Sequence, residues 1–536
     1  MENKPAFGTG GIRGIMGNGK NQINRHTIEH VTHGLAKAIL LSDAPKSVGV
    51  AYDTRHNSAE FAQIVCEIIS AFGIKTYTFD EPKPTPMLSH AIRLLGLGWG
   101  VVITASHNPK EYNGYKVYDR NGVQITDQTA AAITASIDSL DSSDKIPAKQ
   151  KKLIKIFDSG VEKTFIDQII TYISSPFSLL PDSISGLPRR FTPRNDEMIS
   201  LTPYPYPVVY SALHGTGAST IPVVLETLGF SPVCIQQNPD GAFGGIKTPN
   251  PEEPVVYEKA LEEAEKINAK LLLATDPDCD RVGVMVKTEQ GYKLLNGNQL
   301  GALLIDYLAQ TRGVEKNENG SSKAVVISTI VSGILGELVS KDNNLEFVRL
   351  LTGFKYIGEY IANMPEDKSF FFGYEESYGF LAGDGARDKD AVIASALIVK
   401  MAAYYNKKGK TLSGRLQELY EKHGYCLENL YSAQMQQNEQ KNFLSKLRSG
   451  IKIEGLIKTE DYSSGINGLP PADVLKLYFK YIDKETGSPV KAWAAIRPSG
   501  TEPKLKLYTG VHADTREAAE EALKSLTDKM ISIIEE

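Results

Sequence analysis

Three aspartates at alternate positions form the chemically clearest constellation in this chain: Asp276, Asp278 and Asp280, within Thr275-Asp-Pro-Asp-Cys-Asp-Arg281. Carboxylates this close together repel one another unless a cation neutralises them, and hard oxygen ligands select Mg²⁺, Mn²⁺ or Ca²⁺. Arg281 indicates that a phosphate also binds here, because its planar guanidinium matches phosphate oxygens. A solvated acidic turn is the alternative.

Two other aspartate motifs do not fit this segment. An EF-hand loop requires Gly at its sixth position and Glu at its twelfth, where this chain has Arg281 and Lys287. A strand-ending aspartate of the haloacid-dehalogenase kind expects Thr or Val where Asp280 stands. The sequence therefore favours a different kind of metal loop.

A candidate nucleophile, Ser106, lies in Thr104-Ala-Ser-His-Asn-Pro109 after a predicted buried strand. A serine needs activation or a strongly polarised partner before it can attack. A capping turn uses the same residue types and is the alternative. His107 is adjacent, but adjacency in sequence does not imply a Ser-His dyad.

Two segments could bind an anion. Arg497-Pro-Ser-Gly-Thr501, followed by Lys504 and Lys506, resembles a phosphate cradle, since its glycine lets backbone N–H groups approach the anion. A plain surface turn is the alternative. The segment Phe7–Gly14 is Gly-rich but does not follow a strand, so Rossmann and P-loop readings are unsupported, although Arg13 could approach an anion.

A third polar loop, Gly373-Tyr-Glu-Glu-Ser-Tyr-Gly379, offers Glu375, Glu376 and Ser377 as acceptors for sugar hydroxyls. An exposed acidic turn is the alternative here.

The elements that must position these residues recur in three units of strand, helix, strand, helix and strand. Hydrophobic spacing predicts these units over 48–104, 208–274 and 325–372. Strands separated by helices of this length imply a mostly parallel sheet, whose ligands gather at the carboxyl ends of the strands. We call Thr104–Pro109 the serine loop, Thr275–Arg281 the aspartate loop and Gly373–Gly379 the glutamate loop. Each follows the third strand of a unit, which predicts one shared cleft. The rest of the chain, from about Tyr425, reads as an α+β domain, and 180–207 reads as a linker.

Composition limits the class of protein. The 536 residues predict roughly three to four domains, and 41% hydrophobic and 23% charged residues are ordinary globular usage. A net charge of −5 gives no basic excess for nucleic acid or anionic membrane. Four widely spaced cysteines, no apolar N-terminal leader and no apolar run of about 18 residues predict a cytoplasmic protein.

Taken together and in this order, Phe7–Gly14, Thr104–Pro109, Asp276–Arg281, Gly373–Gly379 and Arg497–Thr501 resemble the α-D-phosphohexomutase family across nearly the whole chain. The third loop, with Gly385-Ala-Arg-Asp-Lys-Asp390, is most similar to the phosphoglucomutase/phosphopentomutase branch. Phosphomannomutase-like relatives carry Gly-His after the serine of that loop, whereas Tyr378-Gly379 follows Ser377 here. The resemblance implies three similar mixed-sheet α/β domains and a C-terminal α+β domain around a central cleft. We expect them at 1–200, 201–312, 313–424 and 425–536.

The resemblance also implies roles for individual residues. Ser106 would be the phosphoserine, and its oxygen would join Asp276, Asp278 and Asp280 around Mg²⁺. The catalytic candidates are Ser106, His107, Lys116, Arg281 and Lys389, the two lysines as general acid or base. The implied substrate-binding residues are Thr9, Arg13, Thr352, Gly353, Glu375, Ser377, Arg497, Ser499, Gly500, Thr501 and Lys506.

The activity that the resemblance implies is the interconversion of glucose 1-phosphate and glucose 6-phosphate, with glucose 1,6-bisphosphate as intermediate and activator. Phosphopentomutase, sugar-bisphosphate synthase and non-catalytic phosphosugar-binding regulator remain alternatives. We expect small phosphosugars as partners, no nucleic acid or membrane, and a monomer or weak dimer.

Overall fold

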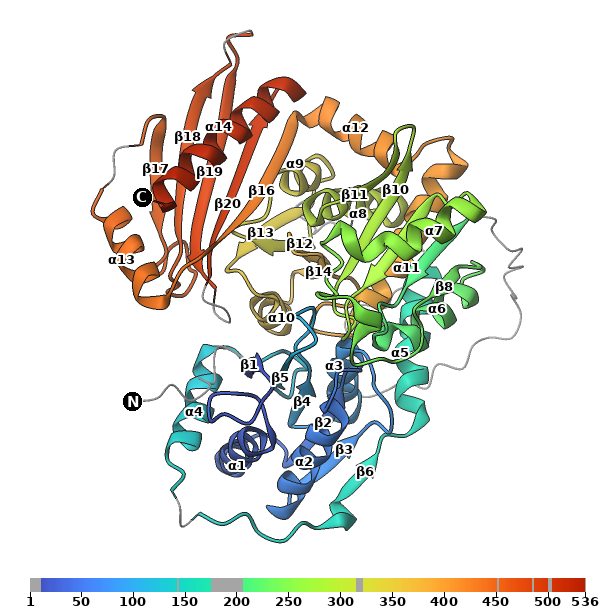
Figure 1. The fold of residues 1–536 in the computed structure, drawn as a ribbon. Helices are drawn as coiled ribbons and strands as arrows, with labels where there is room; N and C mark the ends of the chain where they lie inside the picture. Colours follow the sequence, from blue (N-terminus) through green and yellow to red (C-terminus); the bar gives the residue numbers. More distant parts are fainter. Residues whose placement is uncertain are drawn as a thin grey trace.

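The fold is described from a computed structural model. It covers residues 11–141, 144–174, 206–314, 322–450, 453–483, 486–499 and 504–535. Four sheets organise this part of the chain (Figure 1). Most of the linker predicted at 180–207 lies outside the described residues.

The first unit is a six-stranded sheet in the order β1-β5-β4-β2-β3-β6, with helices on both faces. Its strands β2, β3 and β4 are parallel, and β5 returns antiparallel to β4. Its elements are β1 (Gly11–Ile15), α1 (Arg25–Leu41), β2 (Ser47–Tyr52), α2 (Ser58–Ala71), β3 (Lys75–Thr78), α3 (Thr85–Leu95), β4 (Trp99–Ile103), β5 (Tyr112–Tyr118), α4 (Asp127–Asp138), β6 (Ile154–Ile156) and α5 (Ser159–Ser174).

The second and third units repeat the central part of this topology. Their strand orders are β11-β10-β9-β7-β8 and β13-β12-β14-β15. The second contains β7 (Val208–Ser211), α6 (Ile221–Thr227), β8 (Val233–Ile235), α7 (Glu258–Ile267), β9 (Leu271–Thr275), β10 (Val282–Thr288) and β11 (Gly291–Leu295). The third contains α8 (Gly297–Arg312), β12 (Ala324–Thr329), α9 (Leu335–Asp342), β13 (Glu346–Leu350), α10 (Phe354–Ala362), β14 (Ser369–Glu375), β15 (Gly379–Leu381), α11 (Ala391–Lys407) and α12 (Leu412–His423).

In all three units the first strand of the repeat (β2, β7 or β12) pairs in parallel with the second (β3, β8 or β13) and the third (β4, β9 or β14). A fourth strand (β5, β10 or β15) returns antiparallel to the third. The repeat predicted from the sequence is therefore confirmed. The serine, aspartate and glutamate loops are in each case the connection from the third strand to the antiparallel fourth.

The fourth unit is a five-stranded antiparallel sheet in the order β16-β20-β19-β18-β17, and α14 lies across it (Figure 1). The α+β prediction for this region is confirmed. Its elements are β16 (Tyr425–Gln434), α13 (Gln437–Arg448), β17 (Leu456–Asp461), β18 (Leu475–Ile482), β19 (Pro489–Pro498), β20 (Lys504–Ala513) and α14 (Arg516–Glu535).

Local sequence signals fix several helix starts. The side chain of Asn24 accepts a hydrogen bond from Thr27 N at the start of α1, and Asn296 and Gln299 form a capping box at α8. Asp390 accepts from two backbone N–H groups at the start of α11. These acceptors satisfy N–H groups that have no partner inside the helix.

Apolar packing differs between the units. A single buried cluster joins α3 and α5 of the first unit to strands of the second and to α8 and α11 of the third. The fourth unit has a core of its own and meets the third through a small cluster that includes Ile330, Val331 and Leu351 on one side and Val474 and Tyr508 on the other. The first three units thus share one cluster, and the fourth, which has a core of its own, meets them at a seam formed by the small cluster and by Cys426 of β16.

Helix α8 packs against α9 and β14, so we group it with the third sheet. The boundary expected at residue 312 would leave it with the second, and the three domain boundaries stay predictions. Within the described part of the chain, none of the helices combines the length and apolar character that crossing a membrane requires.

Candidate active site

Ser106 lies in the loop between β4 and β5, buried and in the left-handed backbone region with φ 52°. Its N–H donates to Thr104 Oγ1 over 2.8 Å. A non-glycine residue in this region is under local strain, which persists only where the surroundings hold it.

The group that holds this loop is Arg55, whose side chain is fully buried. Its guanidinium donates to the carbonyls of Ser106 (2.5 Å), Pro109 (2.8 Å) and Tyr112 (3.0 Å), and also to that of Asn108. Several hydrogen bonds from one planar guanidinium fix the path of the chain more firmly than a single bond would.

Asp53 completes this support. Its carboxylate pairs with Arg55 Nε at 3.2 Å and accepts from Thr104 Oγ1 at 2.6 Å and from Ser58 Oγ at 2.7 Å. The sequence reasoning missed Asp53 and Arg55. The available signal was a charged pair directly after the buried strand β2, at the same sheet edge as Ser106.

The aspartate loop between β9 and β10 meets the serine loop. Ser106 Oγ donates to Asp276 Oδ2 over 2.6 Å. The other Asp276 oxygen accepts from the backbone N–H groups of Asp280 (3.1 Å) and Arg281 (3.0 Å). These bonds fold the loop back on itself, so that all three aspartates are buried together.

The triad fits a metal ion. One carboxylate oxygen from each of Asp276, Asp278 and Asp280 lies within 4.8 Å of the others. Oδ1 of Asp278 and Oδ1 of Asp280 are buried without a hydrogen-bond partner. Buried carboxylate oxygens without partners are costly, and a hard cation satisfies them.

The two predicted lysines reach the triad from different units. Lys116 Nζ, on β5, is 2.8 Å from Asp278 Oδ2 and 3.1 Å from Asp280 Oδ2. Lys389 Nζ lies 3.3 Å from the same Asp280 oxygen and 3.1 Å from Asp388 Oδ1. Burial alone would lower the pKa of both lysines, but the carboxylates outweigh it and raise the pKa of each.

The same crowding shifts the aspartates in opposite directions. Burial, with the charges of its two neighbours, raises the pKa of Asp276 well above its usual value. Burial would also raise the pKa of Asp280, but Lys116 and Lys389 outweigh it and lower that pKa. The triad is thus compensated by cations on one side and by the Ser106 hydroxyl on the other.

His107 lies against the nucleophile, with Nδ1 3.2 Å from Ser106 Oγ. Burial, and then the charges of Arg281 and Arg13, lower its pKa well below the usual value. The imidazole is therefore neutral at physiological pH. Arg13 itself donates to Asn108 Oδ1 over 2.8 Å, which brings it to the serine loop.

The glutamate loop follows β14 and contacts the aspartate loop, because Val282 N donates to Tyr378 O over 3.2 Å. Glu375 is buried and accepts from Gly353 N over 2.8 Å, and burial raises its pKa. Thr352 Oγ1 is buried without a hydrogen-bond partner. Ser377 is half-buried in the same loop.

The fourth unit supplies a pair of cations. Arg497 and Lys506 face each other across β19 and β20. Burial, and then the neighbouring Arg497, lower the pKa of Lys506. Ser499 N donates to Lys504 O over 2.8 Å as the chain turns between the strands. The predicted residues Gly500 and Thr501 of this turn, and Thr9, lie outside the described residues.

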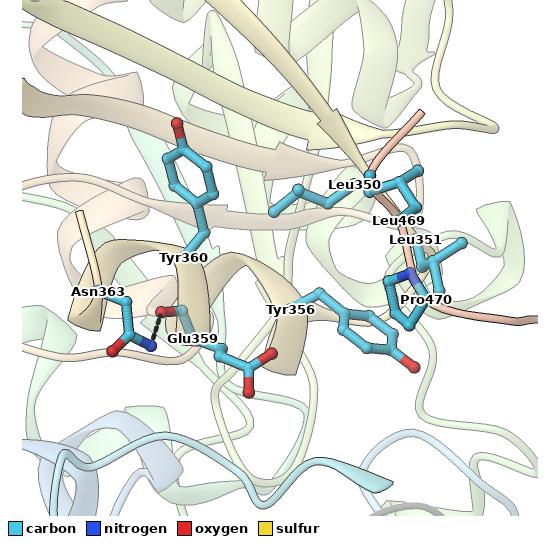
Figure 2. Close-up of a pocket in the computed structure, with 9 residues that line it drawn as sticks. Leu350, Leu351, Tyr356, Glu359, Tyr360, Asn363, Leu469 and Pro470 are labelled. Carbon is cyan, nitrogen blue, oxygen red and sulfur yellow. Dashed lines mark hydrogen bonds between the residues drawn. The ribbon is translucent and has the colours of Figure 1, made fainter. Parts of the chain in front are cut away.

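A pocket of about 230 Å³ lies between α10, the end of β13 and residues 468–470 (Figure 2). Tyr356, Tyr360 and Glu359 line it from α10, and Leu350 and Leu351 from the end of β13. None of the residues predicted for the site lines this pocket. The site instead consists of the loops that meet at the triad.

Four models of the phosphoglucomutase/phosphomannomutase family match the chain: α/β/α domain I at residues 4–144, domain II at 192–291, domain III at 296–423 and the C-terminal domain at 473–526. The fold, the serine loop and the aspartate triad thus define a phosphohexomutase. The chain belongs to the phosphoglucomutase/phosphomannomutase family.

Individual relatives agree with this assignment. A phosphoglucomutase of Staphylococcus haemolyticus is 35% identical over 96% of this chain and 92% of its own. Two solved structures share the fold. A phosphoglucomutase/phosphomannomutase family protein from Burkholderia thailandensis has a TM-score of 0.71 at 16% identity, covering 100% of this chain and 98% of its own. Parafusin, a phosphoglucomutase from Paramecium in an open form, has a TM-score of 0.66 at 17% identity, covering 100% and 95%.

Proposed function

We propose that this enzyme interconverts glucose 1-phosphate and glucose 6-phosphate through phosphorylated Ser106. The single observation that carries the proposal is the 2.6 Å hydrogen bond from Ser106 Oγ to Asp276, within a buried carboxylate triad suited to a cation. Similarity to curated phosphoglucomutases over most of the chain supports the choice of sugar.

The reaction needs two phosphate sites. Phospho-Ser106 transfers its phosphoryl group to a free hydroxyl of the sugar monophosphate, so that the Oγ–P bond breaks as a sugar O–P bond forms. The other phosphate of the resulting glucose 1,6-bisphosphate is held by Arg497, Lys506 and Ser499. The intermediate then turns over, and its second phosphoryl group passes back to Ser106 Oγ.

Asp276, Asp278 and Asp280 would hold Mg²⁺, with a Ser106 oxygen beside them. When bound, the ion neutralises charge on the transferring phosphoryl oxygens, the dominant requirement of this chemistry. The loop bonds of Asp276 to the N–H groups of Asp280 and Arg281 keep the triad in place for this role.

A lysine handles the proton. Lys116 and Lys389 both lie against Asp280 and are protonated in the ligand-free site, so either Nζ can give its proton to the leaving oxygen and take one in return from the attacking sugar hydroxyl. His107, neutral and next to Ser106 Oγ, hydrogen-bonds the nucleophile. Arg281 stabilises negative charge on the transferring group.

The glutamate loop binds the hydroxyl groups of the sugar. Glu375 and Ser377 accept from hydroxyl groups; Gly353 N donates to Glu375, and the unpartnered hydroxyl of Thr352 next to it is a further sugar contact. Arg13 and Thr9 assist with the phosphate. We also expect the fourth unit to hinge while the bisphosphate turns, and its separate core supports its movement as one body.

The test is a coupled assay with Mg²⁺ and trace glucose 1,6-bisphosphate. The purified protein should convert glucose 1-phosphate to glucose 6-phosphate faster than it converts mannose, glucosamine or ribose phosphates. Turnover of ribose 1-phosphate alone would instead indicate a phosphopentomutase. Bisphosphate formation from another phosphoryl donor would indicate a bisphosphate synthase, and binding without turnover a regulator.

A further inference from the structure

One ion pair at the site is not used by the proposed reaction. Arg281 Nη1 lies 2.9 Å from Glu252 Oε1, whereas Arg281 Nε is 3.9 Å from Asp280 Oδ1. Both side chains are partly exposed, Arg281 by 18% and Glu252 by 24%. Glu252 thus holds the guanidinium at the rim of the triad while remaining accessible itself.

Several cationic side chains lie near Glu252. Arg281, Arg13 and Lys506 all lower the pKa of His107, and so share one neighbourhood. The charge of Glu252 raises the pKa of Arg281 and opposes the lowering of the pKa of Lys506, which belongs to the fourth unit. These cations are the groups that a phosphate would need.

Other carboxylates near these cations have partners that fix them. Glu375 accepts from Gly353 N, and Glu376 accepts from Thr329 Oγ1 and Ser332 Oγ. Glu252 approaches Arg281 from the loop between β8 and α7, in Asn250-Pro-Glu-Glu253. It is therefore the carboxylate placed to exchange with a ligand at Arg281.

We propose that Glu252 is a stand-in for phosphate: it pairs with Arg281 in the ligand-free enzyme, is displaced when a sugar phosphate binds, and pairs again when the phosphate leaves. This inference rests on the proposed function. A guanidinium fork binds carboxylate and phosphate oxygens by the same geometry, so the two compete for Arg281. An arginine that is largely removed from water and left without any anion would be costly.

The exchange matters because the bisphosphate must turn over in the site. A phosphate that leaves Arg281 during this rotation would otherwise leave a partly buried charge unpaired. Glu252 lowers that cost, weakening phosphate binding and speeding release. Removal of its charge should therefore tighten binding and slow turnover, so that KM and kcat fall together.

The test is calorimetric titration of glucose 1,6-bisphosphate into Ser106→Ala protein, which cannot react; this ligand brings one phosphate to Arg497 and the other to Arg281. Adding Glu252→Gln should increase the affinity about tenfold, the factor for about 1.4 kcal/mol. Glu252→Asp, which keeps the charge on a shorter side chain, should fall between the two. The matched control is Glu253→Gln, which removes the adjacent charge outside the ion pair and should leave the affinity unchanged.

In the enzyme with Ser106 intact, Glu252→Gln should lower both kcat and KM. An unchanged or weaker affinity in Glu252→Gln, with binding by the Ser106→Ala parent retained, would overturn the inference and leave the proposed function standing. No binding of glucose 1,6-bisphosphate by any of these proteins would overturn the proposed function and this inference with it.

Discussion

Ser106 Oγ donates a 2.6 Å hydrogen bond to Asp276 Oδ2, joining two residues 170 positions apart in the chain. Each stands in the loop that leads from the third strand of the repeated unit, β4 or β9, to the antiparallel strand that follows it. The repeated topology therefore presents a different chemical group at the same place in each unit, and packing of the units brings a nucleophile to a metal site. Function arises at the contact between repeats.

The metal site should be detectable through stability. Mg²⁺ that binds the folded triad should stabilise the protein by about 2.7 kcal/mol at a hundred times its Kd. Asp278→Asn removes one carboxylate while keeping the side-chain shape, so the thermal midpoint should no longer rise with Mg²⁺, and activity should require far more of the ion. Differential scanning fluorimetry across a Mg²⁺ series measures this.

Glu289→Gln is the control for this experiment, because it removes an exposed carboxylate from the same unit. Its midpoint should respond to Mg²⁺ as the wild type does. A full Mg²⁺ response in Asp278→Asn would show that the triad is not the binding site.

Arg55 should act on the reaction without touching substrate. Arg55→Lys keeps the charge but loses the fork that donates to the carbonyls of Ser106, Asn108, Pro109 and Tyr112. Loss of such bonds should lower the free energy of unfolding by about 2–4 kcal/mol. Small displacement of Ser106 Oγ should lower kcat at least about a hundredfold, while KM stays nearly constant.

Steady-state kinetics and denaturant unfolding, both at a temperature where the variant is folded, separate these effects. Arg120→Lys, at an exposed arginine of the same unit, is the control and should change neither quantity. Equal kcat values for Arg55→Lys and the wild type would refute the positioning role.

A buried lysine should make the seam of the fourth unit sensitive to pH. Lys476 Nζ donates to Ile330 O over 2.6 Å and lies 4.6 Å from the Trp493 ring centre. Burial, and then the nearby charge of Arg349, lower its pKa from 10.5 to about 7, although Glu460 and Glu337 oppose the shift.

The sign follows from proton binding. Between pH 7 and 10.5 the unfolded chain keeps this proton while the folded protein has released it. Stability should therefore rise with pH across this window, by at most about 1.4 kcal/mol per pH unit. Lys476→Met should remove that part of the slope in urea titrations followed by tryptophan fluorescence. An identical slope in both proteins would contradict the assignment.

Much of the architecture could be predicted from the chain, because hydrophobic spacing is a local signal. The units expected at 48–104, 208–274 and 325–372 contain β2 to β4, β7 to β9 and β12 to β14. The antiparallel strands β5, β10 and β15 were not predicted individually. Each follows a polar loop directly, and no helical pattern before it marks where the strand begins.

The candidate site shows the same division. Asp276 and Ser106 were found because their neighbours in sequence are chemically unusual. Arg55 and Glu252 were missed because the groups they hold, at Ser106 and Arg281, lie far along the chain. For Arg55 the neighbouring Asp53 was the one available signal, and it does not indicate which loop the pair supports. Residues that position a catalytic loop, or compete with a ligand for a cation, can be recognised only in the folded structure.

The central claim is that the phosphoryl group passes through Ser106, and intact-mass spectrometry tests it most directly. After incubation with Mg²⁺ and glucose 1,6-bisphosphate, the wild-type protein should carry the mass of one phosphoryl group, and addition of excess glucose 1-phosphate should discharge it with formation of bisphosphate. Ser106→Ala should never gain that mass. A phosphoryl increment that persists in Ser106→Ala, or a wild-type enzyme that turns over without ever carrying one, would contradict the account.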